Sequence, residues 1–202
     1  MITTTEATVP RAPGRPRSAE ADDAILEAAI ELFAETGFEG LTVEAVALRA
    51  GVGKATVYRR YSCKAELVAA ACRAYVILGS ETPDTGNLAA DLRALLDSLV
   101  SVLTTTPVGR VMPTLVAEKA RIPVLAAEHH ALVVEKRRRH RSVIDGAIAR
   151  GELQPDVDPE LFIDACVGPV FYRFLVSGAS IDAEFLDALV TSVVRAFAPS
   201  AS

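Results

Sequence analysis

Apolar residues recur every three or four positions through most of this chain, and this spacing constrains the fold more than any other feature. Leu92, Leu95, Leu96, Leu99 and Leu103 form one such series. The spacing places apolar side chains along one face of a helix. No run of alternating apolar and polar residues is bounded by hairpin turns. The sequence therefore predicts an all-α protein.

Capping residues, glycines and prolines set the ends of the predicted helices. The expected helices cover 18–37, 43–50, 54–61, a segment after Ser62, 88–104, 108–121, 123–150, 159–177 and 183–198. Ser18, Thr42, Ser62 and Asp182 are the expected N-caps of four of them, and Asp158-Pro159 is expected to open a fifth. Proline inside a helix cannot donate the internal hydrogen bond. We therefore expect an interruption at Pro113 and a kink at Gly168-Pro169.

Composition excludes several classes of protein. Half of the 202 residues are apolar, which is enough for a sizeable core. No apolar run approaches the roughly 18 residues of a membrane span, and the N-terminus lacks the layout of a secretory signal. The odd set Cys63, Cys72 and Cys166 has no CxxC spacing, which indicates reduced thiols. The sequence predicts a soluble, cytoplasmic protein with no membrane partner.

The net charge of −5 hides a local separation of sign. Acidic residues crowd between Glu20 and Glu44, whereas the segment from Arg49 to Lys64 holds five basic residues and no acidic one. A local positive face matters more for binding phosphates than the charge of the whole chain. The segment 49–64 is therefore the candidate nucleic-acid contact.

Two short helices joined by a glycine-containing turn make a helix-turn-helix arrangement, whose second helix enters the major groove of DNA. Small Ala47 and Gly51 allow close approach of the two helices, and Val52 and Val57 fill the space between them. The second helix is left with an exposed face of donors and flat rings: Lys54, Ala55, Thr56, Tyr58, Arg59 and Tyr61.

Residues from about 24 to 67 resemble the DNA-binding domain of the tetracycline-repressor (TetR) family of bacterial regulators. The matching stretches are Ala28-x3-Leu32-Phe33-x3-Gly37-Phe38, Leu41-Thr42-Val43-x2-Val46-Ala47, Ala50-Gly51-Val52, Thr56-Val57-Tyr58-x2-Tyr61 and Lys64-x2-Leu67. Two positions depart from the pattern. Gly53 stands where the family has a serine cap, and Tyr61 replaces a phenylalanine. Glycine is a tolerable N-cap, so neither departure breaks the resemblance.

The resemblance implies roles for these positions. Thr42, Tyr58 and Lys64 would contact the DNA backbone. The side chains that would face base edges or nearby phosphates are Lys54, Ala55, Thr56 and Arg59. Tyr58 could instead close the core of the small domain. Only one of the adjacent residues Arg59 and Arg60 can point straight into the groove.

The first 17 residues read as a flexible basic arm, because they hold three prolines and no apolar period. Arg15 and Arg17 lie beside prolines in this arm. Arginine in an extended segment suits a narrow minor groove. The arm either reads the minor groove or remains a disordered basic tail.

The resemblance implies that 18–67 binds DNA and that 68–202 binds an effector and dimerises. The predicted dimer interface, a four-helix one, comprises Leu161, Phe162, Phe185, Leu186, Leu189, Val190, Val193, Val194 and Phe197. These residues could instead form an ordinary monomer core. The candidate effector-pocket residues are Met112, Leu115, Leu132, Phe171, Tyr172 and Phe174, each of which could equally be plain core.

Lys136-Arg137-Arg138-Arg139-His140-Arg141 is a dense basic run inside a predicted helix. It spreads over all faces, which favours a solvated surface paired with acids such as Glu128 or Asp145. A pocket for an acidic effector or a contact with the DNA-binding domain are the alternatives. The spacing of His129, His130 and His140 predicts no metal site.

The sequence thus predicts a homodimeric transcriptional repressor that binds a palindromic operator and is released by an unknown small-molecule effector. No catalytic constellation or cofactor motif appears, so neither enzymatic activity nor a cofactor is expected. Two alternatives remain open. One is a DNA-binding regulator without an effector, and the other is a ligand carrier or enzyme with a vestigial DNA-binding domain.

Overall fold

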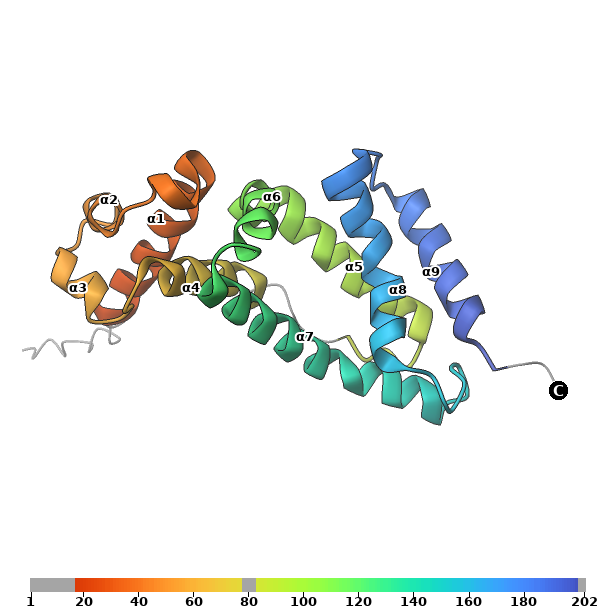
Figure 1. Cartoon of the computed structure of the whole chain (residues 1–202). Helices are drawn as coiled ribbons and strands as arrows, with labels where there is room; N and C mark the ends of the chain where they lie inside the picture. Colours follow the sequence, from red (N-terminus) through yellow and green to blue (C-terminus); the bar gives the residue numbers. More distant parts are fainter. Residues whose placement is uncertain (1–16, 78–82, 200–202) are drawn as a thin grey trace, which may run out of the picture.

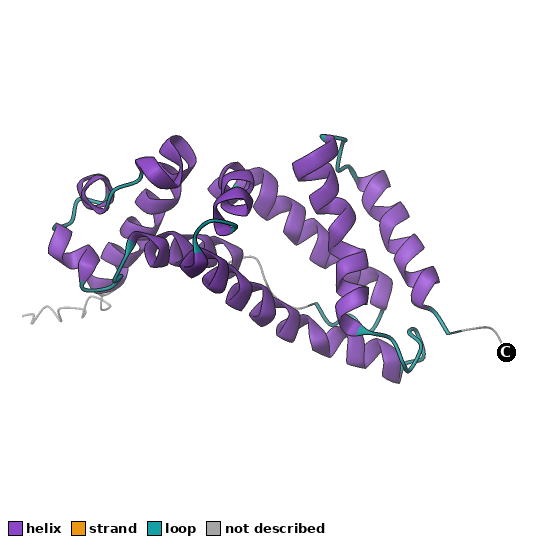
Figure 2. Ribbon diagram, in the orientation of Figure 1, coloured by secondary structure: helices purple, strands orange, loops and turns teal. Residues whose placement is uncertain are grey.

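The computed structural model describes residues 17–77 and 83–199, and within these ranges it is helical, without strands (Figure 2). The helices are α1 (Arg17–Gly40), α2 (Val43–Arg49), α3 (Lys54–Tyr58), α4 (Lys64–Ile77), α5 (Leu88–Thr105), α6 (Pro107–Lys119), α7 (Pro123–Ala149), α8 (Pro159–Tyr172), the π-helix η1 (Arg173–Ser177) and α9 (Ala183–Phe197). The prediction of an all-α fold is confirmed.

The helices fall into two groups along the molecule (Figure 1). α1 to α4 gather at one end, with α2 and α3 outermost, and α5, α8 and α9 pack together at the other end. α6 lies between α1 and α5, and the long α7 packs on α4 and runs toward the far end of the molecule. α6 and α7 therefore contact both groups.

Local signals in the sequence fix most helix ends. Thr42 Oγ1 accepts a hydrogen bond from Ala45 N at 3.1 Å, and Asp182 Oδ1 accepts from Phe185 N at 2.9 Å. Asp158 caps α8 in the same way. The predicted N-caps Thr42 and Asp182 are confirmed, whereas Ser18 lies inside α1 and α4 begins two residues after Ser62. Gly37 has a φ of 69° and breaks the regular helix, because this left-handed conformation favours glycine.

Two predicted features of the helices were wrong. α3 ends at Tyr58, not at residue 61, and the amides of Arg60 and Tyr61 both donate to Val57 O as the chain turns. α6 continues through Pro113, whose side chain is exposed while neighbouring side chains are buried and hold the helix. Packing of apolar side chains there outweighs one lost hydrogen bond. α8 continues as a helix through Gly168-Pro169 and is followed by the π-helix η1, and the kink expected at these residues stays a prediction.

The core is continuous between the two groups of helices. Ile25, Phe33 and Val57 are buried under α1 to α4, and Leu125 and Phe162 are buried in the larger group. α4 packs on both α1 and α7, so the predicted domain boundary after residue 67 falls inside a helix. The two groups of helices therefore share one packed core.

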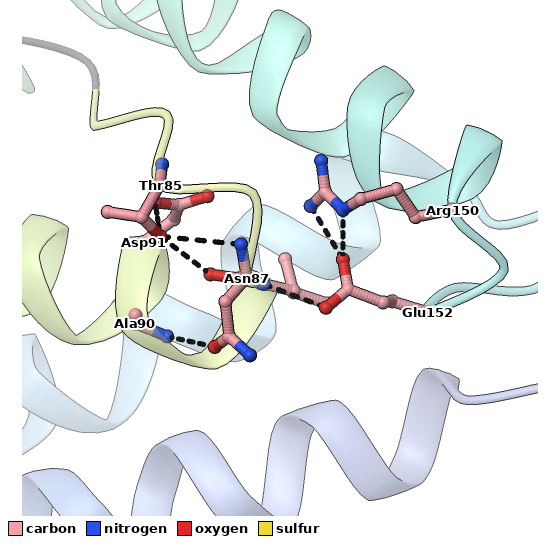
Figure 3. Close-up of polar contacts among 7 residues, drawn as sticks. Thr85, Asn87, Ala90, Asp91, Arg150 and Glu152 are labelled. Atoms are coloured by element: carbon pink, nitrogen blue, oxygen red, sulfur yellow. Dashed lines mark hydrogen bonds and ion pairs between the residues drawn. The ribbon is translucent and has the colours of Figure 1, made fainter.

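A polar junction joins the start of α5 to the end of α7 (Figure 3). The buried Asp91 carboxylate accepts from Thr85 N at 2.8 Å and from Thr85 Oγ1 at 2.7 Å. Glu152 Oε1 accepts from Leu88 N at 3.0 Å, while its other oxygen accepts from Arg150 Nε at 2.7 Å. These bonds satisfy amides at the N-terminus of α5.

Asp91→Ala is expected to lower the free energy of unfolding by about 2–4 kcal/mol, because it leaves the Thr85 amide and hydroxyl without their charged acceptor. Urea unfolding followed by circular dichroism measures this loss. The exposed Asp97 on the same helix is the control, and Asp97→Ala should cost less than about 1 kcal/mol. Equal losses for the two variants would contradict the role assigned to Asp91.

Candidate DNA interface and internal cavity

α2, the following turn and α3 form a compact helix-turn-helix. Val46, Ala47 and Val57 are buried between these helices and α1. Gly51 adopts a φ of 65°, and the Val52 amide donates to Ala47 O at 3.0 Å, which closes the turn. The turn and the small residues Ala47 and Gly51, which the sequence analysis identified, therefore set the angle between α2 and α3.

The outer face of α3 is exposed at Lys54, Ala55, Tyr58 and Arg59, whereas Thr56 is half-buried. Tyr58 is 47% exposed, so its ring does not close the core of the small domain. The Lys54 ammonium forms an ion pair with Glu44 of α2 and lies 5.5 Å from the centre of the Tyr58 ring. Hydrogen bonding to Glu44 raises the pKa of Lys54, so its positive charge is secure.

The two adjacent arginines after α3 point in different directions. Arg60 forms an ion pair with Asp22 of α1 and donates to Thr56 O at 3.5 Å. Arg59 is exposed. Tyr61 is half-buried and packs on the core, where burial raises the pKa of its hydroxyl. Arg59 is thus the arginine available to a ligand outside the domain, and Arg60 and Tyr61 hold α3 in place.

Lys64 is engaged within the domain. Its ammonium donates to Phe38 O at 2.6 Å and lies 4.4 Å from the centre of the Phe38 ring. A cation suits the carbonyl end of a helix, where the helix dipole is negative. Lys64 therefore fixes the end of α1 against the start of α4, and its predicted contact with the DNA backbone remains a prediction. The exposed Thr42 serves as the N-cap of α2.

Residues 1–16 of the predicted arm, Arg15 among them, lie outside the part of the chain that the structure describes. Arg17 is the first residue of α1, and its side chain lies outside the described part of the structure. The proposed reading of the minor groove by the arm stays a prediction.

An internal cavity of about 490 Å³ lies between α5, α6, α7, α8 and η1. This volume lies in the range of sites for small molecules. Its walls are mostly apolar side chains: Leu92, Leu95, Leu96, Leu99, Val102, Met112, Val116, Val133, Val143, Ile144, Phe162, Ile163, Val167, Phe171 and Leu175. Cys166 also lines the cavity, and burial raises the pKa of its thiol to about 12, so it remains protonated at neutral pH.

Two of the six candidate pocket residues, Met112 and Phe171, line this cavity. Leu115 is buried beside it without reaching its surface, and Leu132 lies outside the lining. Tyr172 is 59% exposed, and Phe174 lines a separate, more open hollow at the α5–α6 corner. The rotation of 100° per residue in α8 explains why Phe171 faces inward and Tyr172 outward.

Five basic groups line the cavity. Lys119 comes from α6, and His129, Lys136, Arg137 and His140 come from α7. The sequence analysis left a pocket for an acidic effector as an alternative for the run 136–141, but it did not place Lys119 or His129 there. His129, Lys136 and His140 are seven and four residues apart, which places them on one face. This face continues through Val133 and Val143, and its spacing is the sequence signal that could have identified the α7 wall of the cavity. The hypothesis that the basic run is only a solvated surface is therefore wrong for half of it.

The rest of the basic run is paired on the surface. Arg138 and Arg139 both donate to Glu135, which lowers the pKa of that carboxyl to about 2. Arg141 Nε donates to Asp145 at 2.9 Å, as expected. Glu128, the other acid considered, forms its ion pair with Arg73 of α4 and so ties α7 to the smaller group.

The nine predicted dimer residues lie mostly inside this chain. Phe162, Leu186, Val190 and Val193 are buried, while Phe185, Leu189, Val194 and Phe197 are half-buried and packed on the core. Leu161 is 57% exposed. The apolar stripe of α9 thus packs on α5 and α8 of its own chain.

A different apolar stripe is exposed on α8 and η1. Leu161, Tyr172 and Val176 are 57%, 59% and 70% exposed. With the small residues Ala165 and Gly168 between them, they recur along one side of the helix. An exposed apolar face of this kind marks an interaction surface.

Comparison with known families gives two matches, which together span most of the chain. Residues 25–71 match the family described as bacterial regulatory proteins, tetR family, and residues 82–193 match the tetracyclin repressor-like C-terminal domain. The chain belongs to the TetR family. It is an HTH-type DNA-binding transcriptional regulator of this non-enzymatic family, as its helix-turn-helix indicated.

Similar proteins of the TetR family cover nearly the whole chain. An uncharacterized HTH-type transcriptional regulator of Bacillus subtilis, YdeS, is 32% identical over 90% of this chain and 92% of its own. The DNA-binding transcriptional repressor TetR of Mycobacteroides abscessus is 32% identical over 90% of this chain and 93% of its own. The crystal structure of the TetR family regulator SCO0332 is 31% identical, with a TM-score of 0.72 over 89% of this chain and all of that one.

Within residues 17–77 and 83–199 of this TetR family regulator, no single helix has the length and apolar run to cross a membrane, and α5 and α6 reach these limits only as a pair bent by 88°.

Proposed function

We propose that this TetR family regulator is a homodimeric repressor that binds a palindromic operator and leaves it when a small molecule fills the internal cavity. The observation that carries the proposal is the position of α6. One side of this helix lines the cavity through Met112, Val116 and Lys119, and the helix also packs on α1 of the DNA-binding part. A helix shared in this way couples the two regions.

The outer face of α3 supports the reading of base edges. Arg59 is exposed beside Tyr58, and a guanidinium recognises guanine in the major groove with two hydrogen bonds. In a twofold dimer, two copies of α3 about 34–36 Å apart reach successive major grooves of a palindrome. The affinity then depends on the spacing of the two copies, which is what an effector must change.

Contacts beyond α6 extend the coupling path. Arg49 at the end of α2 donates to both oxygens of Glu35 on α1, at 2.8 Å each, and this pairing lowers the pKa of Glu35. Arg110 of α6 contributes further to the lowering. A shift of α6 therefore acts on α1 and, through Arg49, on α2. To empty a nearly full operator, the effector must favour the released conformation by about 5.5 kcal/mol.

The exposed stripe on α8 and η1 supports the dimer. Leu161→Asp and Tyr172→Asp are expected to convert a dimer into monomers at micromolar concentration, because each buries a charge in an apolar interface. Sedimentation velocity measures this change. Val134→Asp is the matched control, since Val134 is equally exposed on α7. A wild-type protein that remains monomeric would contradict the dimer.

The central experiment is selection of bound fragments from sheared genomic DNA by the full-length protein, with affinities measured at two salt concentrations. A palindromic site whose affinity falls steeply with salt is the expected result, because each phosphate contact releases counter-ions. Weak binding without sequence preference would contradict the proposed repressor.

A further inference from the structure

We propose that the cavity takes an apolar small molecule that carries one anionic group, with Lys136 and His140 as the side chains that hold the anion. The inference rests on the proposed function, since it names the chemical class of the effector. It depends on the uneven distribution of charge around the cavity.

The apolar part of the site comes from α5 and α8. Leu95, Leu99, Val167 and Phe171 face the cavity from these two helices, and they are only half-buried in the chain. An apolar ligand covers such surface and gains about 25 cal/mol for each Å² that leaves water. This wall sets the requirement for an apolar body.

The polar part of the site is basic. Lys119, His129, Lys136 and His140 line the cavity from α6 and α7. The carboxylate of the lining residue Asp164 is held by Arg137, which also pairs with Glu160. Across residues 17–77 and 83–199, no ion pair joins Lys119 or Lys136 to a carboxylate. The positive charge on this side of the cavity is therefore uncompensated.

The lowered pKa values of Lys136 and His140 reflect the electrostatic cost of placing these basic groups together. Burial and then the nearby Arg139 lower the pKa of Lys136, and burial and then Lys136 lower the pKa of His140. The Nδ1 atom of His140 is buried without a hydrogen-bond partner in the described chain. An anion offsets the repulsion between these basic groups, whereas a neutral molecule leaves it in place.

The test uses two fluorescent probes that differ by one charge: anilinonaphthalene sulfonate and its neutral parent, N-phenyl-naphthylamine. The full-length protein is expected to bind the sulfonate at least about tenfold more tightly than the neutral probe. Lys136→Met is expected to weaken sulfonate binding by roughly ten- to a hundredfold, and to leave binding of the neutral probe within about twofold. His140→Gln should act in the same direction, which keeps the test valid if Lys136→Met fails to fold.

Two further variants locate the binding. Arg138→Met removes a charge from the exposed side of the same helix and should leave both probes unaffected. Val133→Phe fills the cavity from α7 and should abolish binding of both. Thermal unfolding checks the fold of every variant. Equal affinity for the two probes, or sulfonate binding that survives Lys136→Met or Val133→Phe, would overturn the inference.

The operator assay separates this inference from the proposed function. A sulfonate probe that prefers the cavity and also releases operator DNA supports both. If the probe binds with the expected preference but leaves DNA binding unchanged, the ligand class stands and the effector role fails. If DNA is released by the neutral probe alone, the effector role stands and the anionic class fails.

Discussion

Arg59→Ala is expected to lower operator affinity by at least about thirtyfold while leaving the thermal unfolding temperature unchanged. The proposed dimer presents Arg59 twice, and each bidentate contact with a base contributes about 1–3 kcal/mol. The side chain is exposed at the end of α3, so its removal costs little in folding. Fluorescence anisotropy with the operator fragment measures the loss.

The neighbouring Arg60 provides the contrast. It pairs with Asp22 and holds α3 against α1, so Arg60→Ala should lower the unfolding temperature as well as the affinity. Arg138→Ala, which removes the same charge from the far surface of α7, should change neither. Wild-type affinity in Arg59→Ala would mean that α3 does not present this arginine to DNA.

Gly109→Ala is expected to lower the free energy of unfolding by about 3 kcal/mol or more, with a fall in Tm of about 6–12 °C. A Cβ atom at this position would lie 1.8 Å from the carbonyl oxygen of Leu103, so the backbone of the α5–α6 corner must move. Differential scanning calorimetry measures both quantities. The same variant should weaken the response of the DNA-binding part to a ligand, because α6 begins at this corner.

Gly168→Ala is the matched control for the corner. Gly168 also lies in a helix, and a Cβ there meets nothing within 4 Å. Replacing a helical glycine by alanine removes backbone freedom from the unfolded chain, so the expected change is a gain of up to about 1 kcal/mol. Similar losses at both glycines would show that the close approach at Gly109 is not the cause.

The sequence alone identified the helices and the helix-turn-helix, because these depend on neighbours within a few residues. Thr42, Asp158 and Asp182 cap helices through hydrogen bonds to amides two or three positions away. Gly51 permits the turn by its own conformation. Pro113 was misread, since its effect on α6 depends on side chains packed from other helices.

The roles of individual site residues depended on distant partners. Arg59 and Arg60 are adjacent residues of the same type. Only the position of Asp22 on α1 distinguishes the exposed guanidinium of Arg59 from that of Arg60, which holds α3 against α1. Lys64 is basic in the expected place, yet its ammonium donates a hydrogen bond to the carbonyl oxygen of Phe38, 26 positions away along the chain. The sequence pattern shows which type of residue stands at a position, whereas the fold decides which partner that residue contacts.

What the sequence determined about this protein is its helical architecture and its DNA-reading segment, since both follow from periodicity and short-range hydrogen bonding. What only the tertiary structure decided is which faces of the long helices turn inward. Lys136 and His140 face the cavity while Arg138 faces solvent, and the apolar stripe of α9 is covered by its own chain while Leu161 is not. The reason is physical: a helix offers every face to its surroundings, and the packing of α5, α6 and α8 selects which face is buried.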